Sequence, residues 1–222
     1  MNVLGFDTSA TGTSACALRT DATAVEIPPG RTGLGGRPRH AQELLPAIER
    51  SRVDAGLEWE DVDAIAVGLG PGGFTGLRIG IATARALAHA RTIPLRPVVS
   101  LAALAAGLGA ALALPVTDAR RGQVYAALYE GGHAHWPPFV ATPEDLLDRV
   151  RTLGTPPVAA GDGSLRCRDL LEGAGVRVAP EHSELHVVRA LHLCKLAHGV
   201  QPTLPEAVVP LYLRAPDAKP AR

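Results

Sequence analysis

Residues 64–90, AIAVGLGPGGFTGLRIGIATARALAHA, predict a buried strand, a glycine-rich loop and then a long helix. The apolar run 64–67 is typical of a strand, the glycines with Pro71 favour a tight turn, and Thr75 is the expected N-cap. Small residues recur at every fourth position and therefore share one helical face: Gly76, Gly80, Ala84 and Ala88. So little side-chain bulk predicts that another helix approaches this face closely, either from a partner or from the same domain.

The glycine-rich loop also matches G-x-G-x-x-G, the pattern of dinucleotide-binding turns, at Gly68, Gly70 and Gly73. Such a site needs an acidic residue about 20 positions further on to hold a ribose. No carboxylate lies between Asp63 and Asp118, so we do not predict a dinucleotide site. Free N–H groups at the start of the helix leave a weak phosphate-binding role open.

The composition is that of a globular protein without a strong charge bias. Basic and acidic residues number 22 each, which argues against a generic nucleic-acid or membrane surface, so no DNA partner and no membrane association are expected. The three cysteines are widely spaced and lack a C-x-x-C pair, which indicates reduced thiols instead of disulfides or a zinc site. With no signal-peptide pattern at the start, the expected location is cytoplasmic.

Hydrophobic patterning predicts the same arrangement of strands twice along the chain. The first copy consists of three short strands and a helix, at residues 3–7, 14–18, 24–27 and 40–52. The second begins with a strand at residues 112–117 that ends in Asp118, followed by a tight turn and a strand at 123–129. Asp118 follows Asp7 by 118 − 7 = 111 positions, half the chain. An internal duplication is therefore expected, with a boundary near residues 97–100, where Ser100 is the expected cap of a further helix.

A duplicated sheet that starts with antiparallel hairpins predicts an α/β protein of two tandem actin-like (ribonuclease-H-like, ASKHA) domains with mixed sheets, residues 1–98 and 99–222. The first hairpins of the two domains would face each other across a cleft, with Asp7 opposite Asp118. The candidate phosphate-binding residues of this degenerate cleft are Asp7, Thr8, Ser9, Asp118 and Arg120. Arg120 and Arg121 either bind an anion there or pair with carboxylates at the domain junction.

Several segments, in this order and spacing, resemble the TsaB (YeaZ) family of bacterial tRNA threonylcarbamoyladenosine biosynthesis proteins over nearly the whole chain. The segments are LGFDTSATGTSACAL at 4–18, HAQELLP at 40–46, GPGGFTGLRIGIATARALA at 70–88, VVSLAALA at 98–105, TDARRGQVYAALY at 117–129, GDG at 161–163 and PLYLR at 210–214. The wider family has been described as glycoproteases (M22), but no residues here supply a peptidase mechanism.

The resemblance implies a subunit without a catalytic site of its own. The active relative, TsaD, holds a metal with H-x-x-x-H on the helix that corresponds to His40 onward, whereas Leu44 stands at the second position here. Another H-x-x-x-H, His182 and His186, lies in a polar segment of the other half and is interpreted as a solvated turn. No metal site and no catalytic residue are therefore predicted.

The leading hypothesis is a scaffold or activator that forms a homodimer and binds a TsaD-type catalytic paralogue through one helical surface. That surface would be built from Leu44, Leu45, Ile48, Gly76, Gly80, Ala84 and Ala88, in a four-helix contact. The alternative is that both helices pack entirely inside their own domain. A TsaE-type ATPase is a further expected partner, and tRNA is reached indirectly.

The runner-up hypothesis is an actin-fold enzyme, a small kinase or carbamoyl transferase, that uses ATP and Mg²⁺ at the cleft of Asp7 and Asp118. Its first turn is poor in glycine beyond Gly12, which disfavours a phosphate clasp. No firmly bound cofactor is expected. ATP or ADP, held weakly or at a partner interface, is left open.

Overall fold

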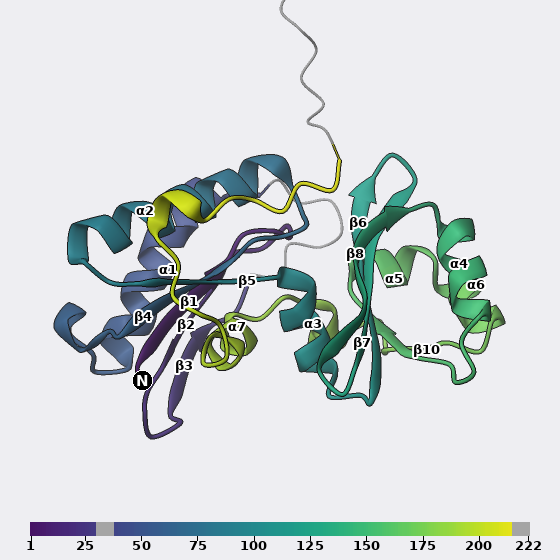
Figure 1. Cartoon of the computed structure of the whole chain (residues 1–222), viewed down its shortest axis with the longest axis horizontal. Helices are drawn as coiled ribbons and strands as arrows, with labels where there is room; N and C mark the ends of the chain where they lie inside the picture. Colours follow the sequence, from purple (N-terminus) through teal and green to yellow (C-terminus); the bar gives the residue numbers. More distant parts are fainter. Residues whose placement is uncertain (30–37, 215–222) are drawn as a thin grey trace, which may run out of the picture.

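The computed structural model describes residues 1–29 and 38–214, whose strands form two five-stranded mixed sheets, one in each of two lobes (Figure 1). The strands are β1 (Val3–Asp7), β2 (Ser14–Leu18), β3 (Ala24–Ile27), β4 (Ala64–Gly68), β5 (Leu95–Val98), β6 (Leu112–Arg120), β7 (Gln123–Glu130), β8 (His133–Ala141), β9 (Val158–Ala160) and β10 (Arg177–Val178). The α-helices are α1 (His40–Asp54), α2 (Phe74–Arg91), α3 (Ser100–Leu108), α4 (Pro143–Arg151), α5 (Asp162–Arg166), α6 (Arg168–Gly173) and α7 (Ala190–Ala197).

The two sheets share one strand order, which confirms the predicted duplication. The first sheet runs β3-β2-β1-β4-β5 and the second runs β8-β7-β6-β9-β10. In both, the first three strands in sequence pair antiparallel, the fourth pairs with the first in parallel, and the fifth pairs with the fourth in parallel. The three strands expected at the start of the chain have the predicted bounds.

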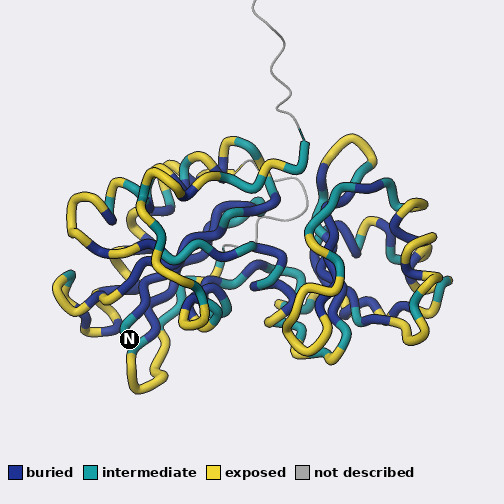
Figure 2. The backbone as a smooth tube through the Cα atoms, in the orientation of Figure 1, coloured by how far each residue is buried: buried dark blue, intermediate teal, exposed yellow. Residues whose placement is uncertain are grey.

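The first sheet is buried on both faces because side chains alternate along its central strand. Leu4 and Phe6 of β1 join a core with α1 and α2, whereas Val3 points to the opposite face, where α3 and α7 pack. Figure 2 shows the central strands of both lobes as buried, with exposed residues on the outer turns of the helices. α1 and α2 therefore form an outer layer, and α3 and α7 an inner one.

The inner layer joins the two lobes. Its apolar cluster includes Leu101 of α3 and Leu193 of α7, together with Val3 of the first sheet and Ala127 of the second. Although α7 comes late in the chain, it packs against β1 and β2, and the Glu26 carboxylate of β3 accepts hydrogen bonds from Leu191 N and the Arg189 guanidinium. A division at residues 98/99 thus separates the two sheets, but it does not follow the packing of the last segment.

Residues 203–214 also lie on the first lobe. Thr203 N donates to Leu95 O at 2.8 Å, extending the edge of the sheet next to β5. Further on, the Arg85 guanidinium of α2 donates to the carbonyl oxygens of Glu206 and Val208. The chain then runs along α2 toward the second lobe, as the yellow segment of Figure 1 shows.

Three local predictions fail for identifiable reasons. α2 begins at Phe74 with Gly73 as its N-cap and no side-chain cap, so Thr75 does not have the predicted role. Ser100 is the first residue of α3, but its hydroxyl bonds to Asp7 and Gly70 instead of capping the helix. The edge strand β8 was not predicted, since two prolines interrupt its sequence pattern.

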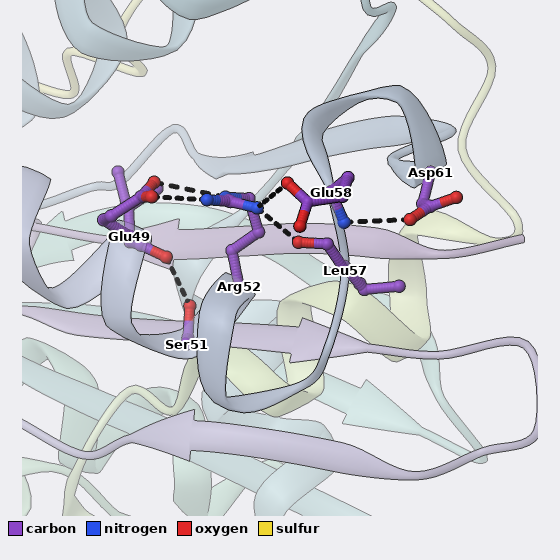
Figure 3. A network of polar contacts seen from close by, with 7 residues as sticks. Glu49, Ser51, Arg52, Leu57, Glu58 and Asp61 are labelled. Atoms are coloured by element: carbon purple, nitrogen blue, oxygen red, sulfur yellow. Dashed lines mark hydrogen bonds and ion pairs between the residues drawn. The ribbon is translucent and has the colours of Figure 1, made fainter.

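The end of α1 is fixed by a buried cation. Arg52, whose side chain is 8% exposed, binds the carboxylates of Glu49 and Glu58 and the Leu57 carbonyl oxygen (Figure 3). Its guanidinium also lies 5.3 Å from the centre of the Trp59 ring, which Arg91 of α2 approaches at 5.1 Å. Cation–π contacts thus tie the ends of α1 and α2 together.

None of the helices within residues 1–29 and 38–214 is both long and apolar enough to cross a membrane.

Candidate functional site

A cleft of about 670 Å³ lies between the two lobes. Its first-lobe side includes the β1–β2 loop and the start of α2, and its second-lobe side the β6–β7 turn and the start of α5. The lining residues with polar or aromatic side chains include Ser9, Thr11, Arg39, His40, Gln42, Phe74, Thr75, Asp118, Arg120, Tyr125, Asp162, Tyr212 and Arg214. The start of α2 supplies N–H groups without a side-chain cap to this cleft.

Three of the five residues that the sequence assigned to the cleft line it. Ser9, Asp118 and Arg120 do, whereas Asp7 and Thr8 lie beneath the wall that Ser9 forms. The Thr8 hydroxyl donates to Gly76 O at 2.8 Å. The prediction that Asp7 faces Asp118 across the cleft is therefore wrong for Asp7, because its carboxylate turns back into the first lobe.

The Asp7 carboxylate is the centre of a buried hydrogen-bond network. It accepts from Ser9 N at 2.8 Å, from the Ser9 hydroxyl at 2.6 Å and from the Ser100 hydroxyl at 2.6 Å. Ser100 in turn accepts from Gly70 N at 3.0 Å. Burial raises the pKa of Asp7, although the hydrogen bonds from Ser100 and Ser9 and the charge of His40 oppose that rise. The network joins the ends of β1, the glycine-rich loop and α3.

Asp118 holds the corresponding place in the second lobe, and it does line the cleft. Its carboxylate pairs with Arg120 at 3.3 Å and with Arg166 at 3.6 Å, while Asp118 N donates to Asp162 at 2.9 Å. Burial raises the pKa of Asp162, and the neighbouring charge of Asp118 contributes to the rise. Arg120 therefore pairs with a carboxylate, one of the two roles expected for it.

The small-residue face of α2 points into its own domain. Gly76, Gly80, Ala84 and Ala88 are all buried, and a Cβ atom at Gly76 would lie 2.2 Å from Thr8 O. At Gly80 it would lie 2.3 Å from the Thr8 hydroxyl. The residue assignment of the predicted contact surface is thus corrected: all four positions are buried within the domain, where Gly76 and Gly80 make room for Thr8 of the β1–β2 loop.

The same correction applies to α1, with one exception. Leu44 and Ile48 are each 1% exposed and belong to the core with β1 and β4, whereas Leu45 is 55% exposed. The outward side of α2 carries a second row of small residues at every fourth position, Ala82, Ala86 and Ala90, all exposed. Periodicity predicted the row that faces inward, and the outward row has the same spacing.

The histidines that the sequence offered as metal ligands make contacts within the protein. His40 begins α1, is buried, and its Nδ1 lies 2.8 Å from the Thr13 hydroxyl, while Leu44 occupies the core. His186 bonds through Nδ1 to Gly161 N and through Nε2 to carbonyl oxygens, and His182 lies in an exposed turn. Within residues 1–29 and 38–214, no group of three or more histidine, cysteine, aspartate or glutamate side chains is arranged to hold a metal ion.

His40 should make the folding stability depend on pH. Burial lowers its pKa below the ordinary 6.5, and the opposing charge of Asp7 only partly restores it. The unfolded chain therefore takes up a proton near pH 6.5 while the folded chain does not. Stability should be complete above that pH and fall as the pH drops toward the folded pKa, by at most about 1.4 kcal/mol per pH unit.

Urea unfolding of the parent and of His40→Asn between pH 8 and pH 5.5 measures this effect. The asparagine keeps a polar atom for Thr13 but does not titrate, so the variant should lose less stability on acidification. Some dependence should remain, because burial also lowers the pKa of His192. Because the charge of His40 also lowers the pKa of Asp7, the difference between the two proteins reports on His40 together with its coupling to Asp7. Equal slopes for the two proteins would contradict the assignment.

Two lobes of one strand order, joined by an inner helical layer and separated by a cleft, define a two-lobed actin-like α/β protein. Residues 36–164 match the family model described as TsaD, tRNA N6-adenosine threonylcarbamoyltransferase. The chain is 34% identical to the tRNA threonylcarbamoyladenosine biosynthesis protein TsaB of Escherichia coli over 190 residues, 79% of this chain and 78% of that one. To TsaB of Bacillus subtilis it is 30% identical over 226 residues, covering 99% and 96%.

A solved structure of YeaZ from Pseudomonas aeruginosa superposes with a TM-score of 0.74 at 28% identity, covering 96% of this chain and 99% of that one. The chain therefore belongs to the TsaB (YeaZ) family of tRNA threonylcarbamoyladenosine biosynthesis proteins. Several of the segments that carried the resemblance contribute residues to the cleft, among them the β1–β2 loop, the glycine-rich loop, the β6–β7 turn and residues 210–214.

Proposed function

We propose that this protein is a non-catalytic subunit in the threonylcarbamoylation of the adenosine next to the tRNA anticodon. In this role it binds a TsaD-type catalytic paralogue, and a second copy of itself, through the outward sides of α1 and α2. A TsaE-type ATPase completes the set of protein partners, and tRNA is contacted indirectly. The interlobe cleft holds no firm cofactor, and ATP or ADP binds it weakly or at a partner interface.

The observation that carries the proposal is the core position of Leu44. The catalytic relative that the sequence resembles uses a histidine at this place as one half of a metal-binding pair. Here the side chain is 1% exposed and packs with the core of the first sheet, and His40 is engaged with Thr13. These residues do not fit a metal pair, so the proposal assigns the transfer chemistry to the partner.

The outward side of α1 and α2 suits a protein contact. Leu45 and Val53 of α1 are each 55% exposed, and Ala82 and Ala86 of α2 leave room for a close helix approach. The cation–π contacts of Trp59 with Arg52 and Arg91 hold the two helices together at one end. A rigid surface binds with a smaller loss of conformational entropy than a mobile one.

Replacing Ala86 by arginine should weaken binding to the TsaD-type paralogue at least tenfold, about 1.4 kcal/mol, because a long charged side chain would stand where the two proteins meet. The variant should remain folded, since the position is exposed. Isothermal titration of each purified variant with the paralogue measures the affinity, and light scattering measures the homodimer. Ala134→Arg, the same change at an exposed position of β8, is the matched control.

Loss of affinity in Ala86→Arg with parental affinity in Ala134→Arg would support the surface. Parental affinity in both would remove α2 from the contact, and the scaffold proposal would then need another surface. Reconstituted tRNA modification with paralogue and ATPase gives the functional readout: the chain alone should be inactive, and Ala86→Arg should fail to restore activity that Ala134→Arg restores.

The cleft favours a second candidate, an actin-fold enzyme that uses ATP and Mg²⁺. Its volume, the uncapped start of α2 and the carboxylates of Asp118 and Asp162 are all compatible with a nucleotide. Calorimetry of the isolated chain with ATP and Mg²⁺ distinguishes the candidates. Micromolar binding with turnover that Asp118→Ala abolishes would replace the scaffold proposal. Asp118 is the better test position than Asp7, because Asp7 does not line the cleft.

A further inference from the structure

Residues 208–214 are anchored on the first lobe before they reach the cleft. Val208 is buried in the core of the first sheet, and its carbonyl oxygen accepts from Arg85 Nε at 3.0 Å. Leu211 N donates to Leu69 O at 2.8 Å. Two backbone contacts, one with α2 and one with the glycine-rich loop, thus fix the path of this segment along the lobe.

An aromatic contact continues the attachment at the edge of the cleft. The Tyr212 ring lies 5.1 Å from the Phe74 ring, and its hydroxyl accepts from Arg78 Nε at 3.2 Å. The Arg78 guanidinium lies 3.7 Å from the centre of the Phe74 ring, so the two aromatic rings and the cation form one group. Phe74 and Tyr212 both line the cleft.

Arg214 then reaches the other lobe. Its Nη1 donates to Gln123 Oε1 of β7 at 3.2 Å. The apolar cluster of α3 and α7 also joins the lobes, and Leu213, the residue before Arg214, packs against that cluster. The last segment therefore meets β7 through the polar contact of Arg214 and joins the apolar cluster through Leu213.

We propose that residues 208–214 act as a latch that limits how far the two lobes open. The apolar junction of α3 and α7 serves as the hinge, because close packing resists separation but permits small rotations. Breaking the contact between Arg214 and Gln123 lets the lobes rotate apart and widens the cleft. The latch belongs to the isolated chain, so its test is independent of any partner and of the proposed function.

Distances between two spin labels, one on each lobe, test the latch. Cysteines introduced by Ala24→Cys on β3 and Glu144→Cys on α4 are exposed, whereas the three native cysteines are buried and remain unlabelled. Pulsed electron paramagnetic resonance then gives the distribution of the inter-label distance. Arg214→Ala and Gln123→Ala remove the same contact from opposite lobes. Each should shift the mean distance upward by more than the width of the parental distribution.

Two further variants sharpen the result. The double variant of Arg214 and Gln123 should shift the distance by less than the sum of the single shifts, because both remove one shared contact. Leu204→Ala, in the same segment but 69% exposed and before the latch, should leave the distribution unchanged. Thermal melting confirms that each variant is folded. If Arg214→Ala and Gln123→Ala give the distribution of Leu204→Ala, the latch proposal is wrong.

Discussion

Arginine in place of Gly80 should leave little folded protein. Gly80 lies on the inward face of α2, where even a Cβ atom would be 2.3 Å from the Thr8 hydroxyl, which is itself bonded to Gly76 O. Overpacking a core typically costs about 1–3 kcal/mol, and a buried charge without a partner adds several more. Because domains are stable by only about 5–15 kcal/mol, the sum takes up much of the available stability. Circular dichroism with urea unfolding measures the loss.

Ala82→Arg is the matched control, since it places the same side chain on the same helix at an exposed position. This control should be folded, with a midpoint close to that of the parent. A folded, monomeric Gly80→Arg protein would contradict the inward orientation of the small-residue face and restore the partner contact that the sequence pattern first suggested.

Removing the carboxylate of Asp7 should lower the free energy of unfolding by about 3 kcal/mol or more. Asp7→Ala leaves the Ser9 N–H group and the Ser9 and Ser100 hydroxyls without their acceptor inside the protein. Each buried polar group left unsatisfied costs about 1–3 kcal/mol, although the hydroxyls can rotate toward other acceptors. The raised pKa shows that burial penalises the charge itself, which offsets part of the loss. Urea unfolding at pH 7 gives the value.

Asp118→Ala and Asp7→Asn are the controls for this result. The Asp118 side chain is itself only 6% exposed, but its partners Arg120 and Arg166 are more than half exposed, so water can solvate both cations once the carboxylate is removed. Asp118→Ala should therefore cost less than Asp7→Ala. Asp7→Asn keeps one acceptor oxygen for the Ser9 groups and should cost less than the alanine. Equal losses in Asp7→Ala and Asp118→Ala would show that the buried network does not distinguish the two carboxylates. If Asp7→Ala alone lost activity, the loss would therefore be explained by destabilised folding and would not show that Asp7 is a catalytic residue.

Local patterns were sufficient for much of the fold. The short apolar segments at 3–7 and 14–18, and the run at 64–67, located strands whose bounds the structure reproduces to within a residue. The repeat of strand, aspartate and turn at Asp7 and Asp118 predicted the duplicated topology. Such signals succeed because each depends on the spacing of residues within one element. β8 lacked that spacing, since Pro137 and Pro138 remove two donors from a strand that pairs on one edge only.

The candidate site was predicted less completely, because it depends on contacts distant in sequence. Ser9, Asp118 and Arg120 were assigned to the cleft, and they line it. Tyr212 and Arg214 were noted only as part of a family segment, and nothing in their own neighbourhood predicts that Tyr212 meets Phe74 or that Arg214 meets Gln123. Ser100 was expected to cap a helix and instead bonds to Asp7, 93 positions earlier in the chain.

The sequence by itself determined many of the elements, their duplication and the family, because propensity, periodicity and motif order are all properties of the chain. Only the tertiary structure decided what covers each face. Helical periodicity shows that Gly76, Gly80 and Ala84 lie on one side of the helix. It does not show whether that side is buried, because burial depends on which segments pack against it in the folded protein. The β1–β2 loop packs on that side at Gly76 and Gly80, whereas the outward row at Ala82 and Ala86 is exposed. The return of α7 and of residues 203–214 to the first lobe has the same cause, since the open face of a sheet is covered by whichever apolar segment packs best there.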